Sequence, residues 1–107
     1  MDKDNLYLNH ILDAAATVEV YIVGVSFDEF RLDEMRQDAV IRQIQIIGEA
    51  VKRLSPEFIS KHTAIPWTDI AGMRNKLVHD YFAVDLSIVY EVAVTEVPKV
   101  REWLEKL

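Results

Sequence analysis

Apolar residues recur along most of the chain at steps of three and four, the spacing that places them on one face of an α-helix. Gly24 interrupts the first such series, and residues 26–31 are expected to form a connection. A second helix is predicted from about Leu32 to Leu54, and its apolar positions cover more than one stripe. Such a helix is usually packed on two sides, and the second side is available to a partner subunit. The first series consists of Leu8, Ile11, Leu12, Ala15, Val18 and Ile22.

Two capping signals mark further helices. Ser55 followed by Pro56 is typical of an N-cap and a first helical turn, and predicts a short helix. Residues 61–65 are then expected to form a loop. Asp85 is a good N-cap for the last helix, whose apolar residues have the most regular period. Pro98 is expected to kink that helix, because proline removes one backbone hydrogen bond.

Another helix is predicted to begin at Pro66 and to continue through Leu77 and Val78. Gly72 lies inside it, where glycine costs about 1 kcal/mol relative to alanine, so close packing is expected there. The sequence contains no internal repeat, low-complexity tract or interdomain linker. It therefore predicts one all-α domain over residues 1–107, an antiparallel bundle of four or five helices.

Composition restricts the function. Half of the 107 residues are hydrophobic, more than the interior of so small a bundle requires, which indicates a buried subunit interface. The net charge of −6 makes the chain a poor general binder of nucleic acid, because phosphate affinity comes from Lys and Arg. Binding to a polynucleotide would therefore need a local basic patch, or basic residues pooled from two subunits.

The chain has no cysteine, which excludes disulfides, thiolate zinc sites and cysteine nucleophiles. Its first residues are polar, and no apolar stretch approaches the ~18 residues of a membrane span. We therefore expect a cytoplasmic protein without a membrane partner.

Candidate chemistry concentrates around His79. Asn75 and His79 are i,i+4 neighbours, which share a helical face. Arg74 lies about 140° around an ideal helix from His79, but its long side chain can reach the same pocket from the flank. Tyr81 follows two residues later. From spacing alone, an ordinary helix C-terminus, where histidine interacts favourably with the dipole, explains the segment equally well.

These side chains can also cleave RNA without a metal. Histidine, with an unperturbed pKa of ~6.5, exchanges protons near neutral pH. Arginine offers a planar set of donors suited to a pentavalent phosphorus transition state. The 2′-hydroxyl of RNA is a built-in nucleophile, which DNA lacks. One histidine per chain is too few for a separate acid and base, but a two-fold dimer supplies both.

Other candidates have simpler interpretations. His10, one turn from Asp13, and His62, in a polar loop, are interpreted as solvated residues. Trp67 is expected to pack into the bundle, and Trp103 lies off the main apolar stripe, where it can contact a partner. The acidic residues of the last helix are interpreted as a solvated face: Glu91, Glu96, Glu102 and Glu105. The basic residues of the second helix either extend a basic patch or are simply solvated: Arg36, Arg42, Lys52 and Arg53.

Arg74, His79 and Tyr81 have the spacing of the R-x4-H-x-Y motif of the HEPN superfamily. The wider sequence resembles the HepT-like toxin branch of that superfamily, over nearly the whole chain. The supporting stretches, in order, are 37–42, 47–50, 54–56, 65–67 and 70–75.

The resemblance implies a HEPN-like helical bundle that forms a homodimer, with the motifs of both subunits lining a shared cleft. It implies a metal-independent ribonuclease without a cofactor, the toxin of a toxin–antitoxin pair. By position, Arg74 and His79 are catalytic and Asn75 is a positioning residue. Asp80 stands in a slot that is often glycine in this branch, and is interpreted as capping the turn.

The implied partner is a minimal nucleotidyltransferase (MNT) antitoxin, which silences the toxin by adding AMP to the motif tyrosine, Tyr81. An adenylate there would fill the cleft, and its negative charge would repel an RNA phosphate. Two alternatives stay open. One is a catalytically inactive helical module that binds and regulates a nucleotidyltransferase, which the acidic net charge slightly favours. The other is a plain dimeric scaffold, which the residues around His79 argue against.

Overall fold

A computed structural model describes residues 2–77 and 83–107 of the chain. Every regular element in these two ranges is helical, which confirms the all-α prediction. In order along the chain, the elements are α1 (Lys3–Ile22), α2 (Phe27–Phe30), α3 (Glu34–Lys52), α4 (Pro56–Lys61), α5 (Trp67–Ala71), α6 (Met73–Lys76), α7 (Leu86–Glu91), the π-helical turn η1 (Val92–Glu96) and α8 (Val97–Glu105).

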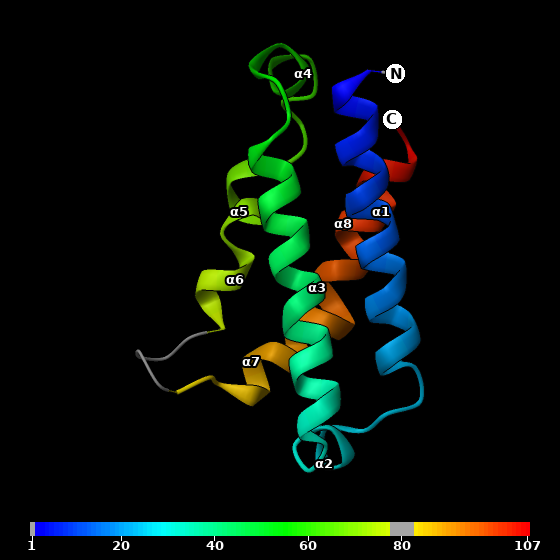
Figure 1. Ribbon diagram of the computed structural model, residues 1–107, viewed down its shortest axis with the longest axis vertical. Helices are drawn as coiled ribbons and strands as arrows, with labels where there is room; N and C mark the ends of the chain where they lie inside the picture. Colours follow the sequence, from blue (N-terminus) through cyan, green and yellow to red (C-terminus); the bar gives the residue numbers. More distant parts are fainter. Residues whose placement is uncertain (1, 78–82) are drawn as a thin grey trace.

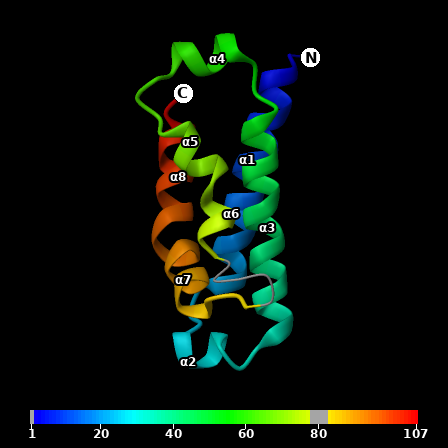
Figure 2. The same cartoon turned by 90° about the vertical axis from the view of Figure 1, so that its left-hand side faces the viewer.

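Helices α1 and α3 lie side by side and antiparallel, and the run α7–η1–α8 packs against them (Figures 1 and 2). Helices α5 and α6 pack on α3 on the side away from α1 (Figure 1). The short helices α2 and α4 lie at opposite ends of the bundle. One face of α3 is thus left between α1 and the α5–α6 pair.

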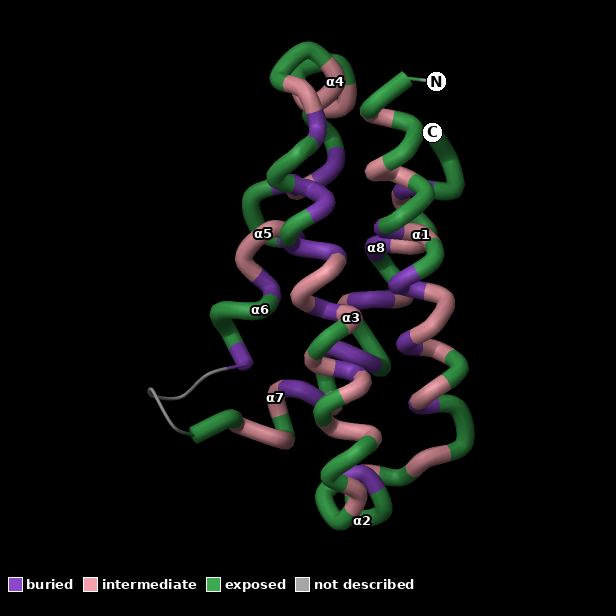
Figure 3. The backbone as a smooth tube through the Cα atoms, in the orientation of Figure 1, coloured by how far each residue is buried: buried purple, intermediate pink, exposed green. Residues whose placement is uncertain are grey.

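Buried apolar residues form one core between these helices, and the purple stretches of the backbone in Figure 3 mark the buried positions. They come from all the long elements and include Ile11, Val18, Ile44, Ile47, Val89 and Val97. Each fully buried side chain of this size contributes about 1.5–3 kcal/mol relative to exposure, so the core is the main source of stability. In the described part of the chain, no polar or charged side chain is buried. No helix there is both long enough and apolar enough to cross a membrane.

The expectation that residues 26–31 form a simple connection is wrong, because they contain α2. The Ser26 hydroxyl accepts a hydrogen bond from Glu29 N–H at 3.1 Å, and the Glu29 carboxylate accepts one from Ser26 N–H at 3.0 Å. This reciprocal capping box begins the helix, and the fully buried Phe30 anchors it. A helix of one turn is too short to produce the apolar period on which the prediction depended.

The single helix predicted from Pro66 through Val78 is also wrong, because Gly72 separates α5 from α6. The close packing expected at Gly72 occurs at Gly48 instead. A Cβ on Gly48 would lie 3.0 Å from the carbonyl oxygen of Ala71, whereas one on Gly72 would lie 3.4 Å from the Thr68 oxygen. Gly48 therefore sets how closely α3 approaches the end of α5.

The remaining predictions for helix boundaries are largely confirmed. Ser55 and Asp85 cap α4 and α7. Just before Pro98 the chain forms the π-helical turn η1, where Val97 N–H bonds to the Val92 oxygen five residues back, and the kink expected at Pro98 stays a prediction. Trp67 is buried as predicted, and its Nε1–H donates a hydrogen bond to the carbonyl of His62 at 2.9 Å.

A polar contact fastens the start of α1 to the start of α4. The Asp4 carboxylate accepts hydrogen bonds from the backbone N–H and the hydroxyl of Ser55, both at 2.7 Å. The same hydroxyl accepts a hydrogen bond from Phe58 N–H at 3.1 Å, so Ser55 caps α4 and binds α1 at once.

Replacing Asp4 with asparagine is expected to lower the melting temperature at neutral pH. The hydrogen bonds from the hydroxyl and then the N–H of Ser55 hold the pKa of Asp4 below its ordinary value of 3.8. A lowered folded-state pKa stabilises the fold above the unfolded-state pKa, and this contribution is lost as the pH falls through the folded-state value. Melting curves of Asp4→Asn and wild type should therefore converge in acid below the ordinary carboxylate range. Equal melting temperatures at neutral pH would contradict this prediction.

Candidate active site

Helix α6 and the residue after it bury their apolar side chains in the core and leave their polar side chains exposed to solvent. Met73 and Leu77, four residues apart, are buried in the core. The side chains between them, including Arg74 and Asn75, are exposed. The buried pair fixes the rotation of the helix and thereby presents the guanidinium and the amide to solvent.

The other residues of the predicted motif, His79, Asp80 and Tyr81, lie outside the described residues. Of the predicted catalytic pair, the structure thus locates Arg74, with Asn75 beside it in sequence. The roles assigned to all of these side chains remain predictions.

Two contacts fix the chain on either side of residues 78–82. Asp85 N–H donates a hydrogen bond to the carbonyl of Leu77 at 2.9 Å. Lys76 Nζ lies 2.8 Å from Glu96 Oε1 in the turn η1. Glu96, interpreted as part of a solvated face, is about one-third exposed, and it also pairs with Lys76.

The ion pair raises the pKa of Lys76, chiefly through the hydrogen bond that its ammonium donates to the Glu96 carboxylate. A partly exposed pair of this kind contributes at most about 1 kcal/mol. Its importance is positional, since it ties the end of α6 to the turn η1.

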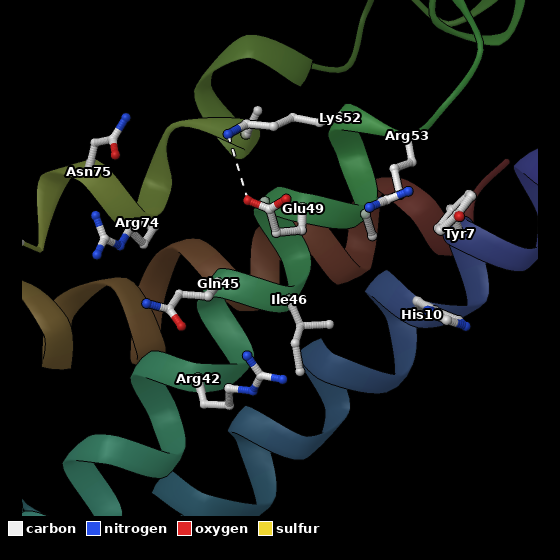
Figure 4. Close-up of a pocket in the computed structure, with 13 residues that line it drawn as sticks. Tyr7, His10, Arg42, Gln45, Ile46, Glu49, Lys52, Arg53, Arg74 and Asn75 are labelled. Atoms are coloured by element: carbon white, nitrogen blue, oxygen red, sulfur yellow. Dashed lines mark ion pairs between the residues drawn. The ribbon is translucent and has the colours of Figure 1, made fainter.

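A groove with a cavity volume of about 500 Å³ lies over the exposed face of α3. Its walls are α1 on one side and the α5–α6 pair on the other, and Arg74 and Asn75 stand at one edge (Figure 4). Tyr7 and His10 stand at the opposite edge, with their ring centroids 5.8 Å apart. We call it the α3 groove.

The lining of the α3 groove is strongly basic. Arg42, Lys52, Arg53 and Arg74 line it, and the one carboxylate in its lining is Glu49. Lys52 Nζ lies 3.8 Å from Glu49 Oε1, whereas no ion pair within residues 2–77 and 83–107 engages the three arginines. The α3 groove is therefore a positively charged region on a chain whose net charge is −6.

The structure thus decides between the two interpretations of the basic residues on α3. Arg42, Lys52 and Arg53 belong to the same groove as Arg74. Arg36 does not, because its guanidinium bonds to the Asp33 carboxylate and the carbonyl of Tyr21.

Comparison with known proteins gives the family. A family model described as ribonuclease HepT-like matches residues 11–107. The chain belongs to the HepT-like family. The resemblance read from the residues is therefore confirmed, and the HepT-like protein has relatives in archaea and bacteria.

A Methanocaldococcus jannaschii protein named "Gamma-glutamylcyclotransferase and putative RNase" is 44% identical over 108 residues. The match covers 100% of this chain and 49% of that protein, so the chain spans about half the length of this relative. A "Putative RNase" of Caldanaerobacter subterraneus is 41% identical, over 94% of this chain and 90% of the relative. A "Probable ribonuclease HepT" of Thermococcus cleftensis is 38% identical, over 94% and 92%. No solved structure matches the chain.

Sequence reasoning missed the α1 side of the site. His10 was interpreted through its neighbour Asp13, but it lies beside Tyr7 in the lining of the groove. Tyr7 and His10 are three residues apart, so they share a face of α1. That spacing was a usable signal, but only the packing of α1 on α3 brings this face toward Arg53.

Proposed function

We propose that this HepT-like protein is a ribonuclease toxin that cleaves RNA through Arg74 and His79. The observation that carries the proposal is the exposed guanidinium of Arg74, which forms no ion pair with residues 2–77 or 83–107, at the edge of a basic groove in an otherwise acidic protein. The family and the RNase names of its relatives support the same activity.

The proposed reaction is transesterification within RNA. The His79 imidazole accepts the proton of a 2′-hydroxyl, whose oxygen attacks the adjacent phosphorus. The bond from O2′ to phosphorus forms as the bond to the 5′-oxygen breaks. Arg74 donates hydrogen bonds to the phosphoryl oxygens, where negative charge accumulates. A protonated imidazole returns a proton to the departing 5′-oxygen, so protons balance and no metal enters the scheme.

A homodimer is part of the proposal, because acid and base are both needed and each chain carries one His79. Exposed apolar side chains support an interface between copies. Val20, Val23, Leu32 and Met35 are each at least 70% exposed. These side chains lie near the end of α1 and the start of α3. The two helix ends are held together by the hydrogen bond from the Arg36 guanidinium to the carbonyl of Tyr21.

Regulation by an MNT antitoxin that adds AMP to Tyr81 completes the proposal. The arginines of the α3 groove, Arg42, Arg53 and Arg74, give its physical rationale. A phosphate attached at Tyr81 would be attracted to Arg74, and the adenylate would then occupy the position of the substrate phosphate.

Expression in a bacterial host tests this function. Wild type alone should arrest growth and degrade bulk RNA, and His79→Ala should do neither. Co-expression with a cognate nucleotidyltransferase should restore growth and add one AMP mass to wild type but not to Tyr81→Phe. Harmless wild type with intact RNA would favour the inactive regulatory module instead. Equal toxicity of wild type and His79→Ala would contradict the catalytic assignment, and equal masses of the two co-expressed proteins would contradict AMP transfer to Tyr81.

A further inference from the structure

The α3 groove extends well beyond the position of one scissile phosphate. Arg42, Ile46, Glu49 and Arg53 follow one another at steps of four, three and four, so they form one stripe along α3. Eleven residues of helix separate the two arginines by about 16 Å. Successive phosphates of a stacked strand are about 3.4 Å apart along the axis, so the stripe matches several nucleotides.

The positive charges are placed along and across this groove. Arg42 lies on α3, Arg53 is the C-cap of that helix, and Arg74 lies on the α6 wall (Figure 4). None of the three takes part in an ion pair within the described ranges. The planar guanidinium binds phosphate through two parallel hydrogen bonds, and three of them around one cavity are suited to a chain of phosphates.

The end of the groove farthest from Arg74 carries aromatic rings. Tyr7 and His10 meet edge to face, with an angle of 70° between their planes. The Arg53 guanidinium carbon lies 6.0 Å from the centre of the Tyr7 ring. Rings beside a basic groove stack on unpaired bases, which a duplex keeps inside its helix.

We propose that the α3 groove binds single-stranded RNA, with Arg42 and Arg53 on phosphates several nucleotides apart and the Tyr7 ring stacked on a base. The inference rests on the proposed ribonuclease function and adds the path of the substrate away from the scissile bond. In this proposal Arg42, Arg53 and Tyr7 bind the RNA strand and take no part in the cleavage step, which is assigned to Arg74 and His79. They hold the strand so that one phosphate reaches Arg74.

Binding of an uncleavable strand tests the path separately from cleavage. The probe is a fluorescent single-stranded oligoribonucleotide with 2′-O-methyl groups, titrated with full-length protein at several salt concentrations. The double variant Arg42→Gln/Arg53→Gln should weaken binding at least tenfold. It should also reduce the slope of log affinity against log salt by about 1.4, since each phosphate contact on a single strand contributes about 0.7. Arg31→Gln is the matched control, because Arg31 is an exposed arginine outside the α3 groove, and both values should stay unchanged.

The aromatic part has its own variants. Tyr7→Leu should weaken binding about tenfold without changing the salt slope, and Tyr7→Phe, which keeps the ring, should bind as wild type does. A duplex of the same sequence should bind more weakly than the single strand. Thermal melting curves of every variant check that the fold is unchanged.

Several results would overturn the proposal. The first is a double arginine variant that binds with the affinity and the salt slope of wild type. The second is equal binding of duplex and single strand. The third is a double variant whose oligomeric mass changes while its RNA affinity does not. The last result would mean that a second copy covers the groove. If the variants bind normally while wild type still cleaves RNA, this inference fails and the ribonuclease function stands. If wild type binds the strand as expected but never cleaves RNA, the function fails and the binding path stands.

Discussion

Replacing Arg74 with alanine is expected to lower the rate of RNA cleavage about 10²–10³-fold, the cost of removing one donor to a developing oxyanion. The side chain is exposed and forms no ion pair within the described ranges, so its removal should leave the melting temperature unchanged. The buried neighbours Met73 and Leu77 keep α6 in place in the variant. Initial rates on a defined single-stranded RNA, together with melting curves, measure both effects.

Arg74→Lys separates charge from shape. Lysine keeps the positive charge but lacks the planar fork, so it should recover only part of the lost rate. The loss should appear in kcat, because Arg74 acts on the transition state, whereas Arg42→Gln/Arg53→Gln should chiefly raise KM. A fall in cleavage no larger for Arg74→Ala than for Arg31→Ala would exclude Arg74 from catalysis.

Gly48→Val is expected to destabilise the protein by about 1–3 kcal/mol, the usual cost of forcing extra atoms into a packed interior. The first added carbon would lie 3.0 Å from the carbonyl oxygen of Ala71, closer than such atoms normally approach. Valine gains little in helix propensity over glycine, so little offsets the clash. Chemical denaturation at neutral pH should show a lower unfolding midpoint, with Gly48→Ala between the variant and wild type.

Gly72→Ala is the matched control, because it adds the same carbon at the residue next to Ala71 but outside the Gly48 contact. There the new atom would lie 3.4 Å from the Thr68 oxygen, an ordinary contact, and the backbone has a φ of −89° that alanine adopts readily. This variant should be as stable as wild type or more stable by about 0.4–1 kcal/mol. Should the two alanine variants lose equal stability, the close approach at Gly48 would have no special role.

Gly48 also connects stability with the site. It lies on α3 in the floor of the groove, and the Ala71 carbonyl it faces immediately precedes Gly72 and α6. Pushing α5 outward would move Arg74 relative to Arg42 and Arg53. Gly48→Ala should therefore lose RNA affinity even at temperatures where it is fully folded.

Local sequence signals determined much of this protein. The apolar periods of α1, α3 and the last helical run fixed their faces, because a helix repeats every 3.6 residues whatever surrounds it. Capping residues Ser55 and Asp85 marked two helix starts, since they satisfy backbone groups within a few residues of themselves. The spacing of Arg74, His79 and Tyr81, together with the ordered stretches around it, was enough to indicate the HepT-like family.

Only the tertiary structure decided what depends on contacts between distant segments. The close approach lies at Gly48 and not at Gly72, because it is a property of two helices meeting and not of one helix. The partner of Glu96 is Lys76, twenty residues away, which no spacing rule connects. Likewise, Tyr7 and Arg53 line one groove with Arg74 because α1 and α6 lie on either side of α3. The sequence therefore determined which residues lie on each helix face, and the packing of the helices determined which of those faces are in contact.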